Sequence, residues 1–172
     1  MSVSLVELRA LSEQDAAAHN AGEDALTVRW LTGAYATTET TIAHFRRLAE
    51  NARAGTGKRG FGVWLHGRLA GYVDCDPDNR DGLEAGDVNL SYAVHPWARG
   101  RGVATEAVRL MCAYVRDHGI GSRAAIRVDP DNHASVRVAE KCGFTPVREH
   151  LSTTDHDAVG NPLTIRIYLL DL

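Results

Sequence analysis

The glycine-rich junction "VHPWARGRGVATEA", residues 94–107, constrains the fold of this chain more than any other segment. A run with the alternation of a β-strand ends at Pro96, and a run with helical periodicity begins near Thr105. A strand that stops just before a helix places unpaired backbone N–H groups and the positive end of the helix dipole at one point. The junction therefore predicts an anion site.

Two glycines and two arginines form the middle of this junction. Gly100 and Gly102 have no Cβ to hold a ligand away from the backbone, and Arg99 and Arg101 can pair with phosphate oxygens. As the alternative, the glycines serve only a tight turn and the arginines point to solvent. The segment is not a P-loop, because no Gly-Lys-Ser/Thr follows, and it lacks the third glycine of the dinucleotide-binding GxGxxG pattern.

The periodic segments around the junction predict an alternation of strands and helices. The expected strands are residues 4–11, 61–66, 68–75, 87–94, 123–128, 145–152 and 163–172. The expected helices are residues 13–20, 38–51, 105–119 and 134–142. Residues 61–94 read as three consecutive strands of an antiparallel meander, and the length of the chain predicts one domain, residues 1–172.

Composition argues against several classes of function. Nineteen basic and twenty-two acidic residues give a formal net charge of −3, which offers no electrostatic case for nucleic acid or an anionic membrane surface. No apolar run approaches the length of a membrane span, which is about 18 residues. The first residues lack the features of a signal peptide. The chain has three cysteines, an odd number and outside any CxxC pattern: Cys75, Cys112 and Cys142. We therefore expect them to be reduced, buried thiols. We expect a soluble, cytoplasmic protein.

A second segment, "VDPDNHASVRVAEKCGF" at residues 128–144, also joins a strand to a helix. Asn132 and Ser135 lie three residues apart at this junction, and a Gly-Phe pair ends the helix. Taken singly, either polar residue is typical of a helix N-cap.

Together the two segments closely resemble the Gcn5-related N-acetyltransferase (GNAT) superfamily. Its signatures are Arg/Gln-x-x-Gly-x-Gly/Ala and, in one branch, Asn-x-x-Ser-x-x-(Val/Ala)-x-Glu-Lys-x-Gly-Phe, which match residues 99–104 and 132–144. The segments "LVELRALSEQDA" and "NLSYAVHPWARGRGVATEAV" resemble the Rim-type branch, which includes N-acetyltransferases of ribosomal-protein termini and of small amines or antibiotics. The resemblance covers nearly the whole chain. It implies an α+β fold with a mixed, mostly antiparallel sheet of about seven strands, helices on both faces, and splayed fourth and fifth strands.

The resemblance also implies acetyl-coenzyme A as co-substrate, without a metal. The backbone amides of residues 101–105 would cradle the pyrophosphate, and the fourth strand at residues 92–94 would hold the pantetheine arm and polarise the thioester carbonyl. Ser135 would return a proton to the departing thiolate. Arg137 would contact a ribose or a phosphate of the coenzyme; as the alternative, it is a solvated helix residue. The coenzyme-binding residues implied are Tyr92, Ala93, Val94, Arg99, Gly100, Arg101, Gly102, Val103, Ala104, Thr105, Asn132, Ser135 and Arg137.

The acceptor amine is protonated at neutral pH, so a base or a water chain must remove its proton. Many relatives carry a Glu on the fourth strand where this chain has Asn89, which would hold a water instead. Asp87, two residues earlier on the same face, is the nearest substitute, so the catalytic candidates are Ser135, Asn89 and Asp87. The loop between the last two strands lies over the acceptor site in this branch and supplies other candidates: Glu149, His150, Asp155 and His156. Their spacing fits no common metal-ligand pattern.

These residues predict an acetyl-coenzyme A-dependent N-acetyltransferase that acts by direct transfer on a primary amine: a protein or peptide N-terminus, or a small amine or antibiotic. No cysteine in the two motifs has a neighbouring base, which disfavours an acyl-enzyme. The alternative is a noncatalytic coenzyme A-binding or sensor domain of the same fold. A nucleic-acid-binding module is a third and weaker alternative.

The sequence leaves the acceptor and the oligomeric state open. The protein is a monomer or a homodimer. Acidic residues cluster before and along the fourth strand and in the final hairpin, and they would attract a cationic acceptor, such as a polyamine, if they lined one pocket mouth. As the alternative, they form a solvated acidic loop. These residues are Asp74, Asp76, Asp78, Asp81, Glu84, Asp87, Asp155 and Asp157.

Overall fold

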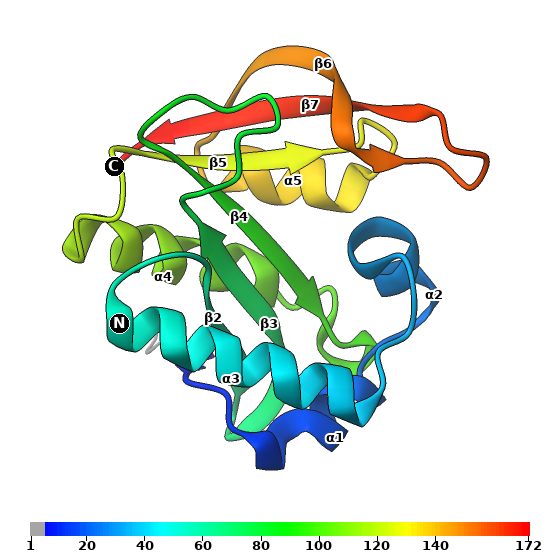
Figure 1. Ribbon diagram of the computed structural model, residues 1–172, viewed down its shortest axis with the longest axis vertical. Coiled ribbons are helices and arrows are strands. Elements are labelled where there is room, and N and C mark those ends of the chain that lie inside the picture. The colour runs from blue at the N-terminus through cyan, green and yellow to red at the C-terminus, as the bar shows by residue number, and fades with distance from the viewer. Residues whose placement is uncertain (1–5) are drawn as a thin grey trace.

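A computed structural model describes residues 6–172, so Ser4 and Leu5 of the first expected strand lie outside the described residues. Seven strands form one sheet in the order β1-β2-β3-β4-β5-β7-β6 (Figure 1). The strands are β1 (Val6–Arg9), β2 (Arg59–Leu65), β3 (Arg68–Asp76), β4 (Asp87–Val94), β5 (Arg123–Val128), β6 (Thr145–His156) and β7 (Pro162–Asp171).

The α-helices are α1 (Ala16–Ala21), α2 (Ala25–Thr27), α3 (Thr38–Ala54), α4 (Val103–Asp117) and α5 (His133–Lys141). Short helical turns are η1 (Glu13–Asp15), the wider turn η2 (Val28–Thr32) and η3 (Pro96–Ala98). The sequence predicted every longer element but not α2 and η2. These two form through local hydrogen bonds rather than an apolar stripe, because the Asp24 carboxylate accepts from the Thr27 backbone N–H at 3.0 Å and so caps α2.

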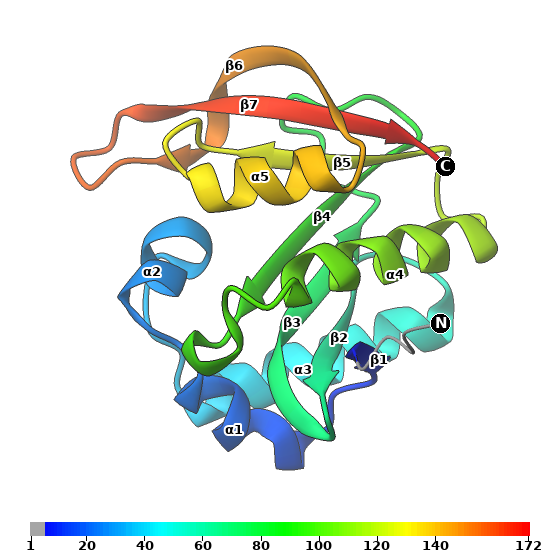
Figure 2. The ribbon, with the colours of Figure 1, turned by 180° about the vertical axis from the view of Figure 1, so that it is seen from behind.

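Helices cover both faces of the sheet. α1 and α3 lie on one face (Figure 1), and α4 and α5 lie on the other, which is in front when the molecule is turned (Figure 2). α4 buries an apolar stripe against the sheet: Val103, Ala107, Val108, Met111, Cys112 and Val115. A second cluster joins α1 and α3 to β3 through Ala16, Phe45, Leu48 and Tyr72. The sheet is therefore buried between two layers of helices.

The expected meander is confirmed, since β2, β3 and β4 pair antiparallel in sequence order. β4 then pairs parallel with β5, but only through Asp87–Arg123, Val88–Ala124 and Asn89–Ala125. β5 continues along β7 as far as Val128, whereas the edge of β4 from Leu90 to Val94 parts from β5. The predicted α+β fold, with a mostly antiparallel sheet and splayed fourth and fifth strands, is confirmed.

None of the helices in residues 6–172 has the length and apolar character needed to cross a membrane.

Close contact between β3 and β4 requires a glycine at position 71. Gly71 pairs with Val94, and a Cβ built on Gly71 would lie 2.2 Å from the Ala93 carbonyl oxygen. That oxygen belongs to the backbone of the splayed part of β4, so it cannot move away without shifting the strand. The small residue therefore fixes how closely the free edge of β4 approaches its neighbour.

We expect Gly71→Ala to destabilise the fold by about 1–3 kcal/mol, the usual cost of overpacking, as measured by urea denaturation. Gly55→Ala is the control, because it adds the same methyl group where no atom lies within 4 Å, at a left-handed φ of +69°. It carries only the backbone cost of about 1–2 kcal/mol. Equal midpoints for wild type and Gly71→Ala would contradict this account of the strand contact.

Candidate active site

Two cavities meet at the free edge of β4. The larger, of about 410 Å³, lies between the splayed strands and is lined by β4, β5, α5, α2, η2 and the turn before α4. The smaller, of about 310 Å³, is lined by α1, α3, β3 and β4 together with α2 and η2. Four residues line both cavities: Thr27, Leu31, Ser91 and Ala93. A ligand in one cavity can therefore approach a ligand in the other across a short stretch of β4.

The N-terminus of α4 opens onto the larger cavity. Gly102 caps this helix with a left-handed backbone (φ +76°), a conformation that other residues adopt only with strain. Val103, Ala104 and Thr105 form the first helical turn and line the cavity. Their backbone N–H groups are at the positive end of a 15-residue helix, which favours an anionic ligand.

Arg99 connects this turn to α2 and to the edge of β4. Its guanidinium donates to both carboxylate oxygens of Asp24, at 2.6 and 2.8 Å, and its Nε donates to the Val94 carbonyl at 2.9 Å. The Arg99 guanidinium holds the pKa of Asp24 well below its usual range. Because Asp24 also caps α2, this ion pair fixes α2 and η2 as a wall of both cavities.

Ser135 and Tyr92 lie together on the other side of the larger cavity. The Ser135 and Tyr92 hydroxyl oxygens are 2.7 Å apart, so a hydrogen bond joins α5 to β4 across the splay. Burial raises the pKa of Tyr92, which keeps its phenol protonated. The Asn132 side chain accepts from the Ser135 backbone N–H at 3.2 Å and caps α5. The pair thus presents two hydroxyl groups to the cavity.

The predicted coenzyme-binding residues come together in the structure. All of them line the larger cavity except Arg101, which lies outside it. The structure adds lining residues that the two motifs did not indicate: Leu26, Thr27, Trp30 and Leu31 from α2 and η2, and Arg127 from β5. Lys141 of α5 also lines the cavity; it belongs to the second motif but was not among the expected coenzyme-binding residues. No sequence signal marked α2 and η2, because they reach the cavity through the Asp24–Arg99 contact between distant segments.

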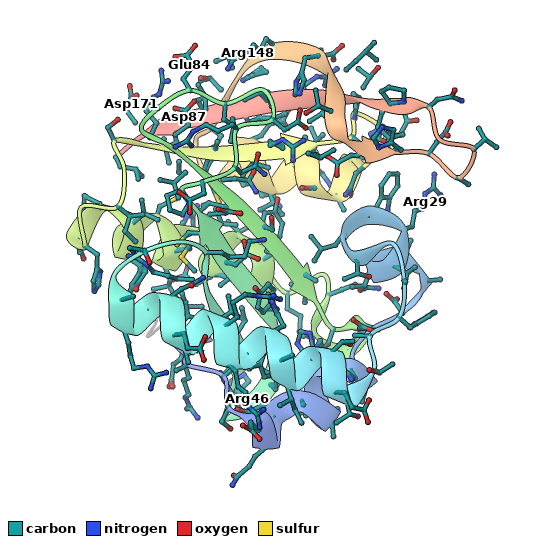
Figure 3. The ribbon with its side chains drawn as sticks, viewed as in Figure 1. Arg29, Arg46, Glu84, Asp87, Arg148 and Asp171 are labelled. Carbon is teal, nitrogen blue, oxygen red and sulfur yellow. The ribbon has the colours of Figure 1, made fainter. Side chains whose placement is uncertain are left out.

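Two of the three catalytic candidates lie away from both cavities. Asp87 is fully buried, accepts from Arg123 Nε at 2.6 Å, and lies beside Glu84 across the molecule from Arg29 of η2 (Figure 3). Asn89, the last β4 residue that pairs with β5, donates from Nδ2 to the Ser91 hydroxyl at 3.2 Å. Of the three catalytic candidates, only Ser135 therefore lines the larger cavity between β4 and β5.

The other base candidates lie on β6 in contacts of their own. Glu149 pairs with Arg166, His150 contacts Asp81 at 3.2 Å, and Asp155 pairs with Arg127 at 2.7 Å. His156 Nδ1 lies 3.3 Å from the Thr154 carbonyl. None of these four side chains lines either cavity. Within residues 6–172, no group of three or more His, Cys, Asp or Glu side chains gathers as metal ligands.

The acidic cluster does not line one pocket mouth. Asp81 is buried against β6, where it accepts from Thr153 N at 2.9 Å, and Asp87 is paired with Arg123. Of the eight acidic residues, only Asp74 lines either cavity. The condition for attracting a cationic acceptor, one common mouth, is therefore not met, and the single acid of this set that lines a cavity is Asp74 in the smaller one.

The cysteines are free thiols held in their protonated form. Cys75 and Cys112 are buried, and burial raises their pKa to about 11 and about 12. Cys142 is half-buried and donates to the Thr105 carbonyl at 3.4 Å. Since a thiol must lose its proton to act as a nucleophile, these environments do not favour a covalent acyl-enzyme.

Histidines line the smaller cavity together with Asp74 and Tyr72. Burial lowers the pKa of His44 and of His95 to about 4, and it also lowers the pKa of His19. All three rings are therefore neutral at pH 7. The cavity has threonine hydroxyls, neutral imidazoles and one buried carboxylate in its walls, together with Lys58 and Glu23.

Solved acetyltransferases share this fold. The RimL ribosomal-protein alpha-N-acetyltransferase in complex with coenzyme A is 18% identical, with a TM-score of 0.81, over 100% of this chain and 97% of that one. The microcin self-immunity acetyltransferase MccE in complex with acetyl-coenzyme A and AMP is 15% identical, with a TM-score of 0.82, over 99% and 94%. The putative acetyltransferase yncA from Salmonella typhimurium is 19% identical, with a TM-score of 0.74, over 98% and 95%. No curated protein gives a significant sequence match.

The chain thus has the fold of solved structures that are described as acetyltransferases. The family model described as "Acetyltransferase (GNAT) domain" matches residues 6–145, so the chain belongs to the GNAT acetyltransferase family. The predicted superfamily and the predicted acetyl-coenzyme A-dependent N-acetyltransferase activity are confirmed at this level.

We expect Gly102→Ala to raise the KM for acetyl-coenzyme A about tenfold, which corresponds to about 1.4 kcal/mol of binding. The Cβ would shift the backbone of the first turn of α4 away from its left-handed cap. Gly119→Ala is the matched control, because Gly119 lies at the other end of α4 with φ +59° and likewise has no atom within 4 Å of a built Cβ. Both variants should lose about 1–2 kcal/mol of stability, but only Gly102→Ala should change the KM. An equal rise in KM for both would contradict the assignment.

Proposed function

We propose that the protein transfers the acetyl group of acetyl-coenzyme A directly to a primary amine. One observation carries this proposal: two cavities on opposite sides of the sheet share Ser91 and Ala93 at the free edge of β4. The larger cavity takes the donor and the smaller cavity takes the acceptor. Their shared wall is where the thioester carbonyl and the amine nitrogen meet.

The donor is held by backbone groups at two places. The N-terminus of α4, with Gly100 and Gly102 beside it, binds the pyrophosphate. The edge of β4 from Leu90 to Val94, released from β5, offers its backbone groups to the pantetheine amides and to the thioester carbonyl. In this arrangement Arg99 organises the site through Asp24 and Val94.

Ser135 and Tyr92 serve the leaving group. When the amine attacks the carbonyl carbon, the C–S bond breaks and the sulfur leaves as a thiolate, which must gain a proton. Ser135 donates its hydroxyl proton to the sulfur and takes the Tyr92 proton through the 2.7 Å hydrogen bond between them. Solvent then restores the proton of Tyr92.

The acceptor is an amine whose reacting end is narrow enough for the smaller cavity. Protein or peptide N-termini, polyamines and amine-bearing antibiotics have such an end. Structural neighbours with named activities include a ribosomal-protein alpha-N-acetyltransferase and a microcin self-immunity acetyltransferase, which supports both kinds of acceptor for this fold. The free cysteines support a cytoplasmic location. We assign the reaction to one domain, residues 1–172, acting as a monomer or homodimer without a metal.

A panel assay tests this function directly. The protein is incubated with acetyl-coenzyme A and, separately, with spermidine, an aminoglycoside and a basic peptide with a free N-terminus. Free coenzyme A thiol is followed with a colorimetric reagent, and the acetylated amine is identified by mass spectrometry. We expect amine-dependent thiol release with one acetylated amine per thiol. Tight coenzyme A binding without turnover of any amine would instead support the noncatalytic alternative.

We expect Ser135→Ala to lower kcat about 10²-fold, the usual contribution of a positioned proton donor, with little change in the KM for acetyl-coenzyme A. The substitution spares the cap of α5, which uses the Ser135 backbone N–H. Tyr92→Phe should lower kcat as well, and the double variant should be no slower than the slower single variant, because the two hydroxyls act as one unit. Additive losses would contradict the shared role.

A further inference from the structure

We propose that Asp74 of β3 binds the ammonium group of the acceptor and is the base that removes its proton. This inference rests on the proposed function, because it assigns a catalytic role within the acceptor cavity. Position 74 carries none of the motif residues, and in the sequence it is only one of several acids, near the end of the expected strand 68–75.

The register of the sheet places Asp74 beside the transfer point. Asp74 pairs with Ser91 across the antiparallel β3–β4 ladder, and side chains of directly paired residues lie on the same face of a sheet. Ser91 lines both cavities, and Asp74 lines the acceptor cavity. The carboxylate is therefore next to the short stretch of β4 where the two cavities meet.

One oxygen of this carboxylate is held and the other is left for a ligand. Oδ2 accepts from the Tyr72 hydroxyl at 2.9 Å and lies 3.7 Å from the Lys58 ammonium nitrogen. Oδ1 is buried and has no hydrogen-bond partner among residues 6–172. Burying a carboxylate oxygen without a donor is costly, and the N–H of a bound ammonium group would satisfy it.

A relay from α3 fixes the orientation of Asp74. The Tyr72 hydroxyl uses its proton to donate to Asp74, so the Tyr72 oxygen accepts a hydrogen bond from His44 Nε2, which lies 3.1 Å away. This direction places the proton of the neutral His44 ring on Nε2. His44 and Tyr72 are thus positioning residues, which hold Asp74 Oδ2 and leave Oδ1 without a donor among residues 6–172.

The electrostatic environment suits a base that works at neutral pH. Burial raises the pKa of Asp74 to about 6, against the opposing effects of Lys58 and of the Tyr72 hydrogen bond. A base with a pKa just below the working pH is both ionised and able to hold a proton. The other titratable groups around it are Tyr72, Cys75 and Asp76 on β3, Arg59 on β2, Lys58 before β2, His44 on α3, His19 on α1, Glu23 after α1 and His95 after β4.

The proposed step balances without any further reactant. The ammonium group donates to Oδ1, and its proton moves to that oxygen as the nitrogen lone pair is freed. The nitrogen then attacks the thioester carbon, the C–S bond breaks, and the thiolate gains its proton from the Ser135–Tyr92 pair. The attacking nitrogen, which still carries one proton more than the amide, releases that proton to solvent. Asp74 returns its proton to solvent when the amide leaves.

Two isosteric variants separate this role from a general effect of charge. Asp74→Asn removes the base and keeps the shape of the side chain, whereas Asp76→Asn is the matched control. Asp76 lies on the same strand, also 3.7 Å from the Lys58 nitrogen, but it does not line either cavity. The readouts are kcat/KM for the best amine of the panel from pH 5 to pH 9 and the affinity for coenzyme A.

We expect Asp74→Asn to lower kcat/KM at pH 7 about 10²-fold, with unchanged affinity for coenzyme A, and Asp76→Asn to stay within about threefold of wild type. In wild type, kcat/KM should fall below about pH 6 as Asp74 becomes protonated. In Asp74→Asn that inflection should be absent, and log kcat/KM should rise with unit slope until the amine itself deprotonates. A structural role of Asp74 would lower the rate without changing this profile.

Methoxyamine supplies a second, independent readout. It is a weak base and neutral at pH 7, so it needs no proton acceptor before attack. The loss caused by Asp74→Asn should shrink to less than about tenfold with methoxyamine. A loss of equal size with both acceptors, or wild-type kcat/KM in Asp74→Asn, would overturn the assignment and leave the proposed function standing. Failure of the wild-type protein to acetylate any amine would overturn both.

Folding stability reports on the same carboxyl without any substrate. The pKa of Asp74 is raised in the folded protein, so folding favours its protonated form, and this contribution is lost as the pH rises through about 6. Asparagine does not ionise, so Asp74→Asn should melt no lower than wild type at pH 8. A markedly lower melting temperature of Asp74→Asn than of wild type at pH 8 would show that the carboxylate stabilises the fold, and it would overturn the assignment of Asp74 as a catalytic base.

Discussion

The parallel contact between β4 and β5 consists of only three residue pairs, and the rest of the site depends on where it stops. The Asp87–Arg123 ion pair lies at the closed end, with the carboxylate fully buried. Val88 packs beneath it in the main core. Beyond Asn89, β5 stays with β7 while β4 stays with β3, so the two strands diverge because each follows a different antiparallel partner. The opening is thus a product of sheet pairing.

Polar contacts between distant segments then build the walls of this opening. Arg99 joins the turn before α4 to the cap of α2, and Tyr92 reaches across to α5. On the other face, His44 of α3 is linked to β3 through Tyr72. Each of these contacts joins elements that the sheet alone would leave apart. The walls of the larger and the smaller cavity are therefore held by separate sets of hydrogen bonds, and the two cavities share one strand, β4.

Sequence periodicity predicted most of the fold, because the longer elements bury regular apolar stripes. The stripe of α4 and the alternation of β2, β3 and β4 are visible locally. The glycine and Asn/Ser motifs likewise located the larger cavity, since a helix N-terminus and its preceding turn are contiguous in sequence. α2 was missed because it is a three-residue helix that forms around Asp24 and Arg99, 75 residues apart.

The acceptor side was harder to predict for the same physical reason. Asp87 and Asn89 were favoured because they lie on β4, but Asp87 is occupied by Arg123, a residue of the next strand. Asp74 differs from the other acids because it is buried and accepts from Tyr72, which in turn contacts His44. These contacts depend on the packing of α3 over β3. A single sequence shows Asp74 only as one acid among several. Contacts made through tertiary packing leave no periodic trace in the chain.

Ser91 and Ala93 have a consequence beyond their place in two cavities. Both are small, and both line the larger and the smaller cavity, so at these positions a single strand separates the two cavities. A larger residue at either position would fill space at the point where the two cavities meet. The size of these two side chains therefore limits how closely ligands in the two cavities can approach each other.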